Sequence, residues 1–177
     1  MKKFFVALMV AFLCLSALST VSAHPHHHDD DGDNYKYGVK KELASSKRAL
    51  KKYRDIEVAL DEGFTGLMPG ACVPNMGIHL IKPNRVDDSK LRITKPEILV
   101  YEPLKDGSYK LVAAEWYVPA EKTDKTPKLF NQKFQGPMAN HDGSPGQHYD
   151  LHAWLFKKNP DGMFEPENKR VSCKYAK

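Results

Sequence analysis

QHYDLHAWLF (residues 147–156) is the stretch that most strongly indicates the fold. Polar and apolar residues alternate along it, and side chains two residues apart lie on the same face of a β-strand. We therefore predict a strand with one apolar row facing a core and one polar row made of His148, Asp150 and His152. Imidazole and carboxylate groups side by side are typical of a metal site or an acid–base site.

The rest of the chain predicts one helix and several more strands. Residues 39–64 have apolar residues at helical spacing, a basic opposite face and Gly63 as a stop signal. The segment 77–81 is short and rich in β-forming residues, which predicts a strand. Segments 97–104 and 109–118 flank an Asp-Gly turn, which predicts a β-hairpin.

These elements predict an α+β fold in a single globular domain, residues 35–177. We expect one N-terminal amphipathic helix packed on a mostly antiparallel β-sheet or small barrel, with long loops. The segment 109–118 is apolar on both faces, which predicts a central strand with Glu115 half-buried. Residues 119–146 are rich in Pro, Gly, Lys and Asn and predict an irregular loop, from which His141 and Asp142 are expected to approach the site.

The N-terminus has the features of a secretory signal peptide. Two lysines precede an apolar run, and Val21-Ser22-Ala23 supplies small residues at the expected cleavage site. We expect removal of residues 1–23, secretion to the periplasm or the extracellular space, and no transmembrane anchor after cleavage. Residues 24–34 are polar and of low complexity, so we predict a disordered tail that binds metals loosely through His24, His26, His27 and His28.

The charge balance argues against nucleic acid as a partner. The chain has 27 Lys and Arg against 22 Asp and Glu, and no phosphate-binding loop motif. A small molecule or an envelope or extracellular protein remains the open choice of partner.

Two of the three cysteines remain after signal cleavage, Cys72 and Cys173. In an oxidising compartment such a pair predicts one disulfide, and closing a loop of this length contributes about 4–5 kcal/mol in the chain-entropy model. The alternative is a nucleophilic Cys72, which would leave Cys173 without a role.

Several blocks of the sequence together resemble the pattern of a group of proteins. They are CVPNMGIH (72–79), KPEILVYEP (95–103), YDLHAWLFKKNPDGMF (149–164) and VSC (171–173). Together they resemble secreted bacterial proteins with C-V-P-x-M-G-x-H, P-E-x-L-x-Y-E-P and L-H-x-W…N-P-x-G-x-F blocks. The resemblance covers most of residues 63–173. It implies export and a shared compact fold, and carries no activity over to this chain.

Neighbouring strands can complete the candidate site. Cα atoms four residues apart on a straight strand are about 13 Å from each other, so His148 and His152 can share one metal only if a bulge or a loop at His148 relaxes this distance. The preferred ligand set therefore includes residues from other strands and consists of His79, Glu115, His148 and His152. Asp150 is a further ligand or an orienting partner, and Glu97 is a reserve ligand. Such donors suit one divalent transition metal, Zn²⁺, Mn²⁺, Fe²⁺ or Cu²⁺.

Three functions follow from these patterns. The first is a secreted domain with a His/carboxylate metal site, used in metal-dependent catalysis or small-ligand binding. The second is a non-catalytic extracellular or envelope binding module in which the histidines are hydrogen-bonded core residues. The third is an oxidative copper enzyme that uses His24 as its mature N-terminal residue, as in lytic polysaccharide monooxygenases.

Overall fold

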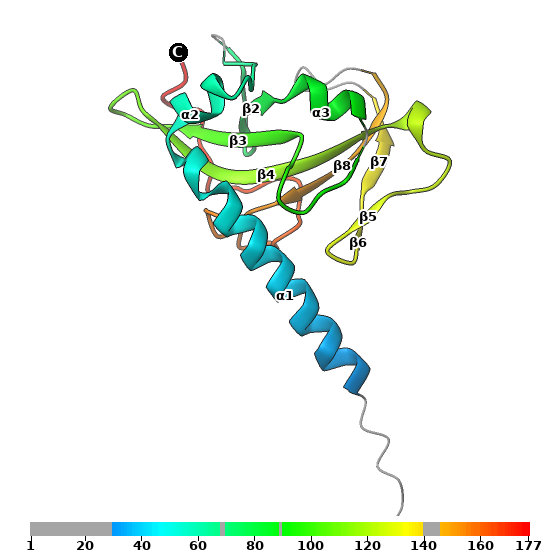
Figure 1. Ribbon diagram of the computed structural model, residues 1–177. Helices are drawn as coiled ribbons and strands as arrows, with labels where there is room; N and C mark the ends of the chain where they lie inside the picture. Colours follow the sequence, from blue (N-terminus) through cyan, green and yellow to red (C-terminus); the bar gives the residue numbers. More distant parts are fainter. Residues whose placement is uncertain (1–29, 68–69, 89, 140–145) are drawn as a thin grey trace, which may run out of the picture.

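The computed structural model of the chain describes residues 30–67, 70–88, 90–139 and 146–177 (Figure 1). The expected signal peptide and residues 24–29 of the histidine-rich tail lie outside this part. The helical elements are α1 (Asp30–Leu50), the 3₁₀ turn η1 (Lys51–Arg54), α2 (Ile56–Asp61), α3 (Pro83–Asp88) and the 3₁₀ turn η2 (Ala120–Lys122). The strands are β1 (Cys72–Val73), β2 (Gly77–Ile81), β3 (Ile98–Pro103), β4 (Tyr109–Pro119), β5 (Lys128–Leu129), β6 (Gln132–Lys133), β7 (Gln135–Met138) and β8 (His148–Ala153).

The predicted α+β fold is confirmed. Six strands form one antiparallel, curved sheet in the order β1-β2-β3-β4-β8-β7, and β5 and β6 form a separate small hairpin. The predicted Asp-Gly hairpin joins β3 to β4, and β4 is the long inner strand that the two-sided apolar pattern indicates. β8 pairs along β4, which places residues 148–153 between β4 and the edge strand β7.

The helical region differs from the prediction of one helix over 39–64. It begins earlier, at Asp30, within the range 24–34 that we expected to be disordered, and the half of α1 nearer the N-terminus extends away from the sheet in Figure 1. It is also interrupted, because Asp55 is extended (φ −88°, ψ 115°) and its side chain accepts the N–H of Glu57, which caps α2. No helix in the described ranges is long and apolar enough to span a membrane.

Both faces of the sheet are covered. On one face, η1 and α2 pack on residues that alternate along the inner strands, among them Leu99, Trp116 and Leu151. The Tyr101 hydroxyl donates a hydrogen bond to the Tyr53 carbonyl (2.7 Å), which joins η1 to the sheet. On the opposite face, Val86 of α3 packs on Ile98 and Tyr117, and Val171 of the C-terminal tail packs on Val100 and Trp154.

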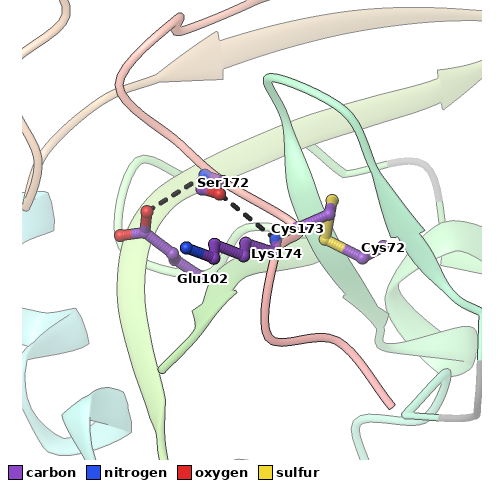
Figure 2. Close-up of a disulfide and its surroundings, with 5 residues drawn as sticks. All are labelled: Cys72, Glu102, Ser172, Cys173 and Lys174. Carbon is purple, nitrogen blue, oxygen red and sulfur yellow. Dashed lines mark hydrogen bonds between the residues drawn. A yellow bond between two sulfur atoms is a disulfide. The ribbon is translucent and has the colours of Figure 1, made fainter. Parts of the chain in front are cut away.

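The predicted disulfide between Cys72 and Cys173 is confirmed, with a Cα–Cα distance of 5.7 Å (Figure 2). Next to it, the backbone N–H of Ser172 donates to Glu102 Oε1 (3.0 Å), and Lys157 donates to both oxygens of the same carboxylate (2.6 and 2.7 Å). These contacts anchor the tail against the sheet at the point where Val171 enters the core.

The segment 119–146 is more regular than predicted. It contains the β5–β6 hairpin, and β7 adds an edge strand to the main sheet beside β8. Propensity did not indicate these strands because they are short and polar, and β7 contains Gly136 and Pro137. Pro is tolerated in edge strands because the outer side of the strand needs no N–H donor. His141 and Asp142 lie outside the described residues.

Candidate metal centre

Three neighbouring parts of the sheet bring His79, Glu115 and His152 together. Glu115 of β4 is the direct Cα partner of His152 on β8, so their side chains rise from the same face. His79 comes from β2, on the other side of β3, where it is the partner of Val100. The curved sheet allows His79 and Glu115 to meet above β3, because two strand spacings of about 4.8 Å are within the combined reach of the two side chains.

The side chains meet through a compact set of donor atoms. Glu115 Oε2 lies 3.4 Å from His152 Nε2 and 3.5 Å from His79 Nε2. One nitrogen or oxygen atom from each of the three residues lies within 4.8 Å of the others. All three side chains are at most 2 % exposed. Among the described residues, this is the group that could hold a metal ion.

The two nitrogen–oxygen distances fit shared coordination better than direct hydrogen bonding. An N–H···O bond normally spans 2.7–3.2 Å. Two ligands of a tetrahedral ion, at bond lengths of 2.0–2.2 Å, are about 3.3–3.5 Å apart. The Glu115–His79 and Glu115–His152 distances therefore have the length expected of ligand pairs on one small divalent cation.

Burial makes the charge of this cluster important. A carboxylate removed from water costs several kcal/mol unless a positive charge or several hydrogen bonds offset the loss of hydration. Glu115 is 1 % exposed, and its neighbours His79 and His152 are neutral in the state that offers a lone pair to a metal. A divalent cation among the three would balance the carboxylate charge in the interior.

Aromatic packing holds the imidazoles in place. The rings of His79 and His152 meet edge to face, with centroids 5.9 Å apart and planes at 89°. Trp154 also stacks with His152, with centroids 6.1 Å apart and planes at 18°, and the Trp154 indole donates to the Glu165 carbonyl (2.6 Å). The spacing of two residues between His152 and Trp154 is the sequence signal for this contact.

The structure places His148 and Asp150 outside the group of three. They share the face of β8 with His152, as predicted, but His148 pairs with Pro119, four positions along β4 from Glu115. The His148 ring stacks on Tyr117 (4.6 Å, 24°), and its Nδ1 lies 3.1 Å from the Gly146 carbonyl. Because a carbonyl oxygen only accepts, Nδ1 carries the proton and Nε2 faces Asp150 Oδ2 at 3.8 Å.

Glu97, the reserve ligand, occupies a separate buried position. Its Oε2 accepts the N–H of Tyr117 (3.1 Å), and its Oε1 accepts no hydrogen bond from the described residues. Burial raises the pKa of Glu97 to about 8, against the opposing effects of the Tyr117 N–H and the Arg85 charge. The raised pKa indicates a protonated acid at neutral pH, and Glu97 is not a member of the group of three.

Comparisons with protein-family models, curated proteins and solved structures find no match to this chain.

Proposed function

We propose that the protein is a secreted metalloprotein that holds one divalent transition metal at His79, Glu115 and His152. The observation that carries the proposal is the pair of 3.4–3.5 Å distances from Glu115 Oε2 to the two imidazole Nε2 atoms in a fully buried cluster. The histidines of the N-terminal tail, His24, His26, His27 and His28, would bind metal only loosely and independently of this site.

The donor types narrow the metal. Two imidazole nitrogens and one carboxylate oxygen suit Zn²⁺, Fe²⁺, Mn²⁺ and Cu²⁺, whereas Mg²⁺ and Ca²⁺ prefer oxygen donors alone. Among these ions, we put Zn²⁺ first, because two histidines and one glutamate form a common catalytic zinc ligand set. The distances from Glu115 Oε2 to the two imidazole Nε2 atoms also have the length expected between ligands of a tetrahedral ion. Fe²⁺ is the second choice, because the same donor types hold mononuclear iron in oxygenases.

The three residues leave at least one coordination position for a water molecule or a small ligand. A metal with an open position can polarise a bound oxygen or make a bound water more acidic, which is the chemistry that this site would supply. In such a site, His79 and His152 donate nitrogen lone pairs and Glu115 balances charge, while Trp154 fixes the orientation of His152. The burial of the cluster favours a small substrate or ligand over a polymer.

Export is part of the proposal and is supported by the signal-like N-terminus and the disulfide. Intact-mass measurement of the secreted protein would test it, with His24 expected as the first residue.

The deciding experiment is elemental analysis of the mature protein without residues 24–33 and without an added histidine tag. We expect about one equivalent of metal, and its loss in Glu115→Gln, which keeps the shape of the side chain and removes the charge. The matched control is Glu97→Gln, a buried carboxyl outside the cluster, which should retain the metal. A folded, disulfide-bonded protein that takes up none of the four metals would refute the proposal and favour the non-catalytic binding module.

A further inference from the structure

A pocket of about 350 Å³ lies between the last turn of α1 and the segment that follows β8. This volume is in the range of small-ligand sites. Its lining includes Lys47 of α1, the aromatic pair Trp154 and Phe156, the lysines 157 and 158, and Met163. The proposed metal ligands do not line it, so the pocket is a separate feature of the molecule.

The pocket carries positive charge that the described residues do not neutralise. Lys47 and Lys158 are exposed, and neither forms an ion pair within the described ranges. Lys157 differs, since it is paired with Glu102. The nearby Asp161 is 3.2 Å from Lys169 and is therefore engaged elsewhere.

An apolar surface lies beside these charges. The Phe156 ring is half-buried, with Lys47 Nζ 5.8 Å and Arg54 Cζ 5.5 Å from its centroid. Cation–π contacts of this kind hold the cations near the ring. Met163 is 42 % exposed and adds a polarisable apolar side chain to the pocket.

We propose that this pocket binds a small amphipathic anion. One anionic group of the ligand would lie between Lys47 and Lys158, and an apolar body would contact Met163 and the part of the Phe156 ring that Lys47 and Arg54 leave exposed. The chemistry of the pocket is complementary to such a molecule, because ammonium groups that pair with no carboxylate of the described residues and exposed apolar surface are both present within one small volume. The inference is independent of the metal site.

A matched pair of dyes tests this inference on the folded, mature protein in the presence of a chelator. The probes are 8-anilinonaphthalene-1-sulfonate and the neutral N-phenyl-1-naphthylamine, which have the same aromatic body and differ in the sulfonate. We expect saturable, one-to-one binding of the sulfonate and much weaker binding of the neutral dye. Replacing both lysines, in Lys47→Ala/Lys158→Ala, should weaken sulfonate binding at least about tenfold, because each removes a charged hydrogen-bond donor.

The control is Lys125→Ala/Lys133→Ala, which removes the same charge from two exposed lysines outside the pocket. Its affinity for the sulfonate should equal that of the unchanged protein. Equal weakening in both double variants, or equal binding of the two dyes, would overturn the inference. A third outcome would also overturn it: the protein sediments with phosphatidylglycerol vesicles, and this binding depends on Lys47 and Lys158 while dye binding does not. The two lysines would then bind a membrane surface.

Discussion

Glu115 and His152 are direct partners across the β4–β8 ladder, and Glu115 Oε2 lies 3.4 Å from His152 Nε2. This pairing depends on strand register, because a slip of one residue would move either side chain to the opposite face of the sheet. The register is held by the core on the other face, where Trp116 is the partner of Leu151. The packing of the apolar face thus positions the polar cluster.

Metal should stabilise the protein through the cluster. A ligand at 100 times its dissociation constant that binds only the folded state adds about 2.7 kcal/mol to the free energy of unfolding. We expect Zn²⁺ to raise the melting temperature of the chain lacking residues 24–33, and to leave that of its His152→Asn variant unchanged. Differential scanning calorimetry with and without metal measures both.

The control for this experiment is His148→Asn, because His148 lies outside the group of three. This variant should keep the metal-dependent shift even if its baseline stability falls. The assignment of the ligands would be contradicted if the His148→Asn variant lost the metal-dependent shift in melting temperature and the His152→Asn variant kept it.

Glu97 should make stability depend on pH. Its pKa is about 8 in the folded protein, where burial favours the neutral acid, against an ordinary value of 4.5. The folded state therefore holds a proton that the unfolded state has released. The contribution of neutral Glu97 to the free energy of unfolding is fully present below pH 4.5. It declines by about 1.4 kcal/mol per pH unit above that and is lost as the pH rises through 8.

Urea unfolding of the chain and of Glu97→Gln at several pH values measures this effect. The difference in stability between the two proteins should change steadily from pH 5 to 8 and then level off, because glutamine does not titrate. A difference that is constant over this range would show that Glu97 is ionised in the folded protein.

Removing the disulfide should destabilise the fold strongly. Cys72 and Cys173 are 101 residues apart, and a cross-link over such a loop contributes about 4.7 kcal/mol in the chain-entropy model. We expect Cys72→Ser/Cys173→Ser to lower the free energy of unfolding by several kcal/mol, measured by denaturant titration. A reducing agent should have the same effect on the unchanged protein and none on the double variant.

The hydrogen bond between Tyr101 and the Tyr53 carbonyl should stabilise the contact between η1 and the sheet. Tyr101→Phe removes the donor and leaves a carbonyl in a buried place, which costs about 1–3 kcal/mol. Tyr149→Phe is the control, because the half-buried Tyr149 hydroxyl forms no hydrogen bond with the described residues. Thermal unfolding should separate the two variants by several degrees, and equal melting temperatures would argue against the bond.

The sequence predicted the local elements well because their signals are local. Alternation identified the strand ending at Ala153, the Asp-Gly turn identified the β3–β4 hairpin, and the pair Cys72 and Cys173 identified the disulfide. The sequence did not indicate the break at Asp55, because an N-cap residue inside a helical pattern hardly changes the apolar periodicity. It did not indicate the edge strand β7 either, because a polar strand has a low β-propensity.

For the site, the amino-acid pattern is enough to identify the available ligand types and to place His148, Asp150 and His152 on one face of a strand. It could not determine which of them faces Glu115, because that choice depends on the pairing of β8 with β4 and on the curvature that brings His79 across β3. Only the tertiary structure placed His79, Glu115 and His152 together and turned His148 toward Tyr117. Contacts between strands are set by register and by the packing of the whole sheet, whereas alternation along one strand is a property of the chain alone.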